Sequence, residues 1–183
     1  MDAAFATLAP LAQLAPSQAL AMPANAVLAF TAPLAAADQD ERRQGFAVGG
    51  LRLMIRYEDG SELAELPAST ALPNAPHWFV GTANLHGVLV PVFDLAAYLG
   101  VARGGRARPM LLVLGHSDDV TGMVIDGLPR RLRWNAAQVA DPGTIPPALA
   151  GLVHNAVTVA DELWLDLDMP ALLDALESAL RNH

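Results

Sequence analysis

Short apolar runs separated by turns rich in glycine, proline, asparagine and aspartate dominate the chain from Phe46 to Leu167. Strands of this length, repeated about every 8–12 residues, are typical of β-barrels and sandwiches rather than helical bundles or parallel α/β folds. The pattern predicts strands at 46–48, 51–57, 62–66, 78–84, 88–94, 109–114, 120–126, 130–134, 152–159 and 163–167. The fold class expected from the residues is therefore mainly β.

One convincing helix is expected, at residues 169–181. Asp168 precedes it and is suited to cap it, and four leucines (Leu172, Leu173, Leu176 and Leu180) fall on one face. A weak internal echo precedes this helix. Apolar strands end in Asp94-Leu95 and in Asp166-Leu167, and each is followed by a helical pattern. The echo indicates either two similar lobes or chance, because Asp-Leu steps are common.

Residues 1–37 differ from the rest in composition. They contain fifteen alanines and four prolines, with Asp2 as their single charge. The acidic start and the regularly placed prolines do not fit a secretion signal, and no run is long enough to span a membrane. A short helix is expected at 17–22, and a charged hinge at 38–44. We expect residues 1–42 to form an Ala/Pro-rich extension and residues 43–183 to form the domain.

Charge and composition exclude several functions. The net charge is −8, so a nucleic-acid partner is not expected, because phosphate binding needs a basic face. All eleven basic residues are arginine, which removes lysine chemistry, and the absence of cysteine removes thiol nucleophiles and Cys-ligated metals. We expect a cytoplasmic protein with no membrane insertion.

No catalytic motif is present in the sequence. The stretch His116-Ser117-Asp118-Asp119 holds the residue types of a catalytic triad, but neighbours within one turn cannot adopt its geometry. His116 with Asp118 or Asp119 would supply only two metal ligands, which are rarely enough. We therefore expect a binding module that is not an enzyme, with no catalytic residue, no metal and no cofactor.

Residues 78–95 carry a resemblance to a known family. The run Gly81-Thr82-Ala83-Asn84-Leu85-His86-Gly87, followed by Pro91-Val92-Phe93-Asp94-Leu95, resembles the signature of the CheW-like domain. Residues 122–126 and 163–173 resemble two further segments of that family, so the likeness extends from about Arg43 to Leu180. The resemblance implies two intertwined five-stranded SH3-like β-barrels with a C-terminal helix. It also implies a non-enzymatic scaffold that couples the cytoplasmic tips of chemoreceptors to the regulatory domain of a CheA-type histidine kinase.

The resemblance also implies partner-binding residues: Gly81, Asn84, Leu85, His86, Gly87, Val124 and Ile125. Asn84 and Gly87 suit the first and last positions of a type I turn, which would place Leu85 and His86 at an exposed tip. Val124 and Ile125 would line a groove for the receptor, although ordinary core packing explains them equally well. The family's arginine in the turn is His86 here. A guanidinium can grip a carboxylate in a bidentate manner and an imidazole cannot, so this departure bears on the strength of partner binding.

Residues 73–78 further resemble the CheW-like proteins of type IV pilus chemosensory systems, which points to twitching motility. A coupling adaptor is thus the first functional hypothesis. The alternative is a free-standing CheW-like module that contacts a response regulator or a pilus component without a kinase. An enzyme or ligand-binding barrel of unrecognised type is the third.

Overall fold

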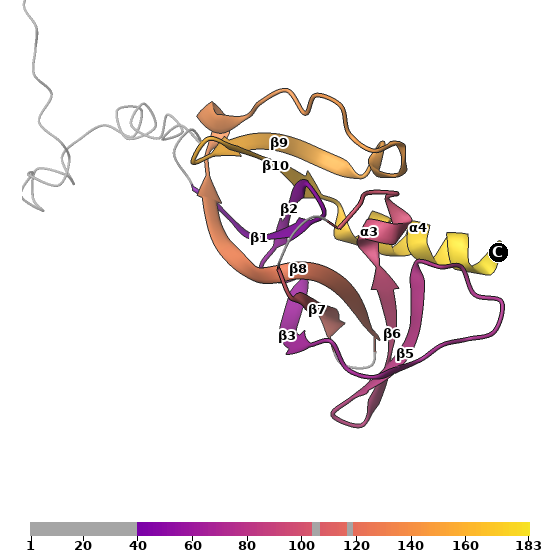
Figure 1. Cartoon of the computed structure of the whole chain (residues 1–183). Coiled ribbons are helices and arrows are strands. Elements are labelled where there is room, and N and C mark those ends of the chain that lie inside the picture. Colours follow the sequence, from indigo (N-terminus) through magenta and orange to yellow (C-terminus); the bar gives the residue numbers. More distant parts are fainter. Residues whose placement is uncertain (1–39, 104–106, 117–118) are drawn as a thin grey trace, which may run out of the picture. The chain divides into compact units, whose positions relative to one another are not determined.

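The computed structural model describes residues 40–103, 107–116 and 119–183 (Figure 1). The expected extension up to residue 39, with its short helix at 17–22, lies outside the described residues, as do Ser117 and Asp118 of the polar turn. The strands are β1 (Glu41–Val48), β2 (Leu51–Arg56), β3 (Gly60–Glu65), β4 (Ser69–Thr70), β5 (Phe79–Leu85), β6 (Val88–Asp94), β7 (Pro109–His116), β8 (Asp119–Trp134), β9 (Val153–Val159) and β10 (Glu162–Leu167). The helices are α3 (Leu95–Tyr98) and α4 (Met169–Arg181), with short 3₁₀ turns η3 (Ala136–Gln138) and η4 (Pro147–Leu149).

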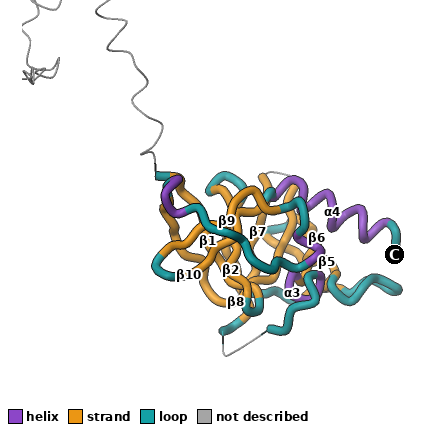
Figure 2. Tube along the Cα trace, turned by 90° about the horizontal axis from the view of Figure 1, so that it is seen from above, coloured by secondary structure: helices purple, strands orange, loops and turns teal. Residues whose placement is uncertain are grey.

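The strands form two lobes with the same plan. Lobe 1 has the order β3-β7-β8-β6-β5 and uses the first part of β8. Lobe 2 has the order β8-β1-β2-β10-β9 and uses the second part of β8. In each lobe the third and fourth strands are parallel and all other pairs are antiparallel. The expected pair of five-stranded lobes is confirmed, and the two-residue β4 is added at the edge of β5. Figure 2 shows β1, β2, β9 and β10 of lobe 2 on the left and β5 and β6 of lobe 1 on the right.

Strand β8 belongs to both lobes, and this differs from the expectation of two separate strands at 120–126 and 130–134. It runs for 16 residues without a break. Gly127 has a φ of +75°, and the register with β1 shifts between Ala47↔Asp126 and Gly45↔Arg130. A bulge at residues 127–129 therefore absorbs the glycine and Pro129, which in sequence read as a chain break. The bulge changes the direction of β8, so that the strand passes from lobe 1 into lobe 2.

Alternation along the strands sorts the apolar side chains into three clusters. Leu53 and Ile55 of β2 face a large cluster shared by both lobes and the helices, whereas Met54 between them faces the interior of lobe 2. The interior of lobe 1 holds a smaller cluster, namely Ala83, Val92, Leu111, Val113 and Val124. The shared cluster is the largest of the three, so most of the buried apolar side chains pack where the two lobes and the helices meet.

Both helices begin at an aspartate cap, and α4 has the expected bounds. Asp94 accepts a hydrogen bond from the N–H of Ala97, and Asp168 accepts one from Ala171. The internal echo therefore corresponds to a structural repeat, although its second cap is Asp168 and not Asp166. Asp166 lies inside β10, only 1% exposed, where it binds the guanidinium of Arg43.

The first strand begins slightly before the expected domain boundary between residues 42 and 43. Glu41 and Arg42 already pair with Trp134 and Arg133 of β8. Backbone hydrogen bonding, which the sequence pattern could not show for these polar residues, extends β1 toward the N-terminus.

Candidate partner-binding surface

The β5–β6 hairpin carries the turn that the sequence singled out, and its conformation differs from the expected type I turn. Leu85 and Val88 form the last cross-strand pair, so the turn consists of His86 and Gly87 alone. Their φ values are +53° and +90°, the positive values that a type I′ hairpin turn requires. Asn84 accepts a hydrogen bond from the N–H of Gly87 at 2.9 Å. His86 lies in the turn as expected, but Leu85 belongs to the last strand pair and Gly87 takes the second turn position, so the turn begins one residue later than expected. The expected turn type was also wrong, because the twist of the paired strands favours the mirror-image form in a two-residue turn.

The tip of this hairpin combines a polar pair with exposed apolar surface. The His86 side chain is 78% exposed, and its Nε2 lies 3.0 Å from Oε1 of Glu62 on β3. On the following strand Leu89 is 71% exposed and Val88 is 39% exposed. We call the exposed surface of Asn84, His86, Val88, Leu89 and Glu62 the tip surface. It ends the hairpin that extends at the bottom of Figure 1.

Val88 and Leu89 were missing from the residues that the sequence indicated. A signal for Leu89 was present, because it stands directly opposite the polar Asn84 in the hairpin register. Opposed residues of an antiparallel pair point to the same side, so an exposed Asn84 implies an exposed Leu89. Large exposed aliphatic side chains at a projecting tip are a feature of protein-interaction sites.

Three of the expected binding residues are buried, and their side chains or backbone pack within the domain. Gly81 has a φ of +129°, and a Cβ there would lie 2.2 Å from the carbonyl oxygen of Thr70, so glycine permits β4 to pack on β5. Val124 is 3% exposed within lobe 1, and Ile125 is fully buried in the shared cluster. Val124 and Ile125 can therefore affect partner binding only indirectly, by supporting the residues that cover them.

A charged network links the two lobes beside α3. The Arg103 guanidinium donates to Oδ1 of Asp94 at 2.7 Å and also pairs with Asp126. The other oxygen of Asp126 accepts from the N–H of Gly49, in the β1–β2 turn of lobe 2, at 2.6 Å. Partial burial opposes the charge on Arg103, but the hydrogen bonds and charges of the two aspartates outweigh it and raise the pKa of Arg103 above its ordinary value. Asp94 and Asp126 belong to the two motifs that carry the family resemblance, and the structure gives both a structural role.

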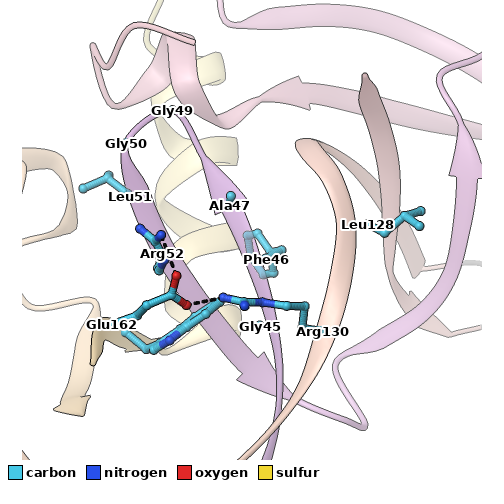
Figure 3. A pocket seen from close by; sticks show the side chains of 11 residues that line it. Gly45, Phe46, Ala47, Gly49, Gly50, Leu51, Arg52, Leu128, Arg130 and Glu162 are labelled. Atoms are coloured by element: carbon cyan, nitrogen blue, oxygen red, sulfur yellow. Dashed lines mark hydrogen bonds and ion pairs between the residues drawn. The ribbon is translucent and has the colours of Figure 1, made fainter. Parts of the chain in front are cut away.

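A shallow depression of about 330 Å³ lies on lobe 2 (Figure 3). Glu162 lies between Arg52 and Arg130 there, with Oε1 2.7 Å from Arg52 and Oε2 paired with Arg130. These hydrogen bonds lower the pKa of Glu162 below its ordinary value of 4.5. The two guanidinium groups share this single carboxylate, so the depression keeps one net positive charge next to Glu162. Leu128 on the β8 bulge, 70% exposed, is the large apolar side chain at its border.

The described residues contain neither a group of metal ligands nor a helix that could cross a membrane. No three histidine, aspartate or glutamate side chains among them gather closely enough to hold a metal ion. None of the helices in this part of the chain is both long and apolar enough to cross a bilayer. The ion pairs described above stabilise the fold, and the exposed apolar tip is a surface suited to contact with a partner. Fold and surface together define a double-barrel protein-interaction domain.

Comparison with known proteins specifies this class further. Residues 44–177 match the CheW-like domain, and the chain belongs to that family. A similar solved structure is that of the scaffolding protein TtCheW from Thermoanaerobacter tengcongensis. The match covers 72% of this chain and 86% of the TtCheW chain, with a TM-score of 0.62 at 16% sequence identity. This likeness confirms the expected pair of SH3-like β subdomains.

Curated relatives include proteins named PilI, FrzA and CheW. The chain is 32% identical over 83 residues to protein PilI of Pseudomonas aeruginosa, covering 45% of this chain and 47% of that protein. It is 36% identical over 109 residues to protein FrzA of Myxococcus xanthus, covering 58% and 64%. It is 28% identical over 142 residues to the chemotaxis protein CheW of Klebsiella aerogenes, covering 75% and 84%. The matched region spans about half the length of PilI.

Proposed function

We propose that the protein is a non-catalytic, cytoplasmic adaptor that couples the tips of chemoreceptors to the regulatory domain of a CheA-type histidine kinase. Membership of the CheW-like family supports this role, and the likeness to PilI favours a pathway that controls type IV pili and twitching motility. The observation that carries the proposal is the tip surface. There Leu89, which is 71% exposed, lies on β6 close to the two-residue turn of the β5–β6 hairpin.

The tip surface suits a protein partner with a small apolar recess. Leu89 and Val88 would be buried on contact, and each fully buried aliphatic side chain contributes about 1.5–3 kcal/mol. The rigid I′ turn holds them at little entropic cost on binding. Asn84 holds the turn through Gly87, and Leu85 anchors it by packing against the interior of lobe 1.

His86 adds a polar side chain to this contact, at a position where the family carries arginine. Its imidazole already has an acidic neighbour, Glu62, within the same chain. A partner carboxylate at this position would compete with Glu62, whereas a partner group that donates to Glu62 would be accommodated. The tip of this protein therefore fits a different partner surface from a tip that carries arginine.

A reconstitution tests the proposal. The kinase, a receptor fragment and the full chain are combined, and kinase autophosphorylation is measured with and without the chain. Leu89→Asp should abolish the effect of the chain and weaken its binding to the kinase regulatory domain by at least about tenfold. Leu128→Asp is the matched control, because Leu128 is the same residue type at 70% exposure on a different surface.

Each outcome decides between the hypotheses. If the wild-type chain neither binds the kinase nor changes autophosphorylation, the coupling role is wrong and the free-standing module that contacts a response regulator or a pilus component takes its place. If the chain couples but Leu89→Asp and Leu128→Asp behave alike, the adaptor role holds and the tip surface is not the contact.

A further inference from the structure

Three arginines stand apart from the other basic residues of the chain. Among the arginines in the described residues, Arg43, Arg52, Arg56, Arg103, Arg108, Arg130 and Arg181 each form an ion pair with a carboxylate. Arg42, Arg131 and Arg133 form no ion pair with any carboxylate of the described residues. All three are exposed, and all three line one depression of about 440 Å³ on lobe 2.

The register of the sheet places these charges close together. Arg42 of β1 lies directly opposite Arg133 of β8. Arg131 is two residues from Arg133 on the same strand, so both point to the same side, with their backbones about 7 Å apart. Like charges in directly opposed positions destabilise an antiparallel pair. The folded chain therefore keeps an unfavourable arrangement here, although acidic residues outnumber basic ones in the whole sequence.

The remaining lining residues complete a surface for an anionic partner. Tyr57, 39% exposed, follows β2 and supplies an aromatic ring and a hydroxyl group. A second depression, lined in part by Tyr57 and Arg131, continues the surface along β8. Glu58 at the border is the acidic residue of the lining, and its carboxylate already pairs with Arg56 at 3.7 Å.

We infer that Arg42, Arg131 and Arg133, with Tyr57, form a docking site for an acidic protein segment in which carboxylates alternate along an extended strand. Carboxylates at positions i and i+2 repeat at about 7 Å, the spacing of Arg131 and Arg133. Each guanidinium can bind a carboxylate through two parallel hydrogen bonds. A single phosphate fits less well, because the three charges are spread over two strands of a sheet face and do not converge on one point.

The site is separate from the tip surface, which lies on the β5–β6 hairpin of lobe 1. It does not depend on the proposed coupling role, since it rests only on the arginines of lobe 2. An acidic segment held here would leave the tip surface free for another contact.

Fluorescence anisotropy with the full chain tests the inference. The probe is a labelled peptide in which glutamate alternates with threonine, and the control probe carries glutamine in place of glutamate. We expect the glutamate peptide to bind more tightly, and its affinity to fall as the salt concentration rises. The double variant Arg131→Gln/Arg133→Gln should weaken binding about fivefold, the loss expected for two exposed ion pairs.

Arg108→Gln is the matched control, because Arg108 is an exposed arginine directly before β7 of lobe 1 and pairs with Glu65. It should leave the affinity unchanged. The melting temperature of the double variant should not fall, since the substitution relieves repulsion with Arg42, and this keeps a loss of binding distinct from a loss of folding. Equal binding of the two peptides, or equal loss in Arg108→Gln, would overturn the inference. Tight binding of a phosphoserine peptide without glutamate, with none of the glutamate peptide, would replace it with a phosphate site.

Discussion

Replacement of Arg43 by methionine should be the most damaging single change among the ionic contacts. Arg43 donates from Nε to Oδ1 of Asp166 at 2.9 Å and from its terminal nitrogen to Oδ2 at 3.1 Å. The side chain of Asp166 is 2% exposed and that of Arg43 is 14% exposed. Arg43→Met would keep most of the packing beside Trp134, but it would leave a carboxylate buried without its partner.

The expected loss follows from the cost of an uncompensated buried charge. Removal of one partner of a buried pair costs about 3–5 kcal/mol, and the partial exposure of Arg43 places this pair near the lower end, at about 3 kcal/mol. For a domain of this size, that loss lowers the melting temperature by about 6–12 °C. Burial opposes the charge of Arg43, but the hydrogen bonds and charges of Asp166 and Glu41 raise its pKa, so Arg43 keeps its charge at any pH used for the measurement.

Urea denaturation of four proteins measures this loss: wild type, Arg43→Met, Asp166→Asn and the double variant. Because the double variant has neither charge, it should be less destabilised than the two single losses added together, with a coupling of about 2 kcal/mol. Arg52→Met serves as the control, since the Arg52–Glu162 pair is exposed to solvent and should contribute much less to stability. If Arg43→Met cost no more than Arg52→Met, the argument from burial would be refuted.

Three further changes probe other parts of the fold. Gly81→Ala should destabilise the domain by about 2 kcal/mol or more in thermal melts, because it combines a positive φ with a backbone clash; an unchanged melt would contradict this geometry. Asp126→Ala should speed hydrogen exchange at the amide of Gly49, which loses its acceptor, and unchanged exchange would show that this link between the lobes is absent. Glu162→Gln should lower stability slightly at pH 7, and the difference from wild type should vanish as the pH falls below about 4.5, because a lowered pKa stabilises only while the carboxylate is ionised. A difference that persists at pH 2.5 would assign the effect to packing.

The strand pattern could be predicted from the sequence because each half-buried strand leaves a local signature. Alternation marked the strands, and the Asp168 cap with its leucine face marked α4 to the residue. The single long β8 was missed because Gly127 and Pro129 are strand breakers locally, and only the register with β1 shows that a bulge accommodates them.

The candidate site was less predictable, since it depends on contacts between distant residues. His86 and Gly87 could be placed in a turn from local preference. The burial of Val124 and Ile125 could not be read from the sequence, because β8 is covered on both faces only after both lobes have formed. The same holds for Asp166, whose partner Arg43 lies 123 residues away.

The strand shared by the two lobes has a consequence for the order in which the chain folds. Lobe 1 is built from one uninterrupted stretch, β3 to the first part of β8, whereas lobe 2 joins β1 and β2 to β9 and β10 from the far end of the chain. During synthesis, the strands of lobe 1 leave the ribosome together and can pair at once. The β1–β2 hairpin can pair with β8 only after most of the chain has emerged, and the outer edge of β2 stays unpaired until β10 follows. Closure of so long a loop is slow, so we expect assembly of lobe 2 to limit the folding rate and to be the stage most exposed to aggregation.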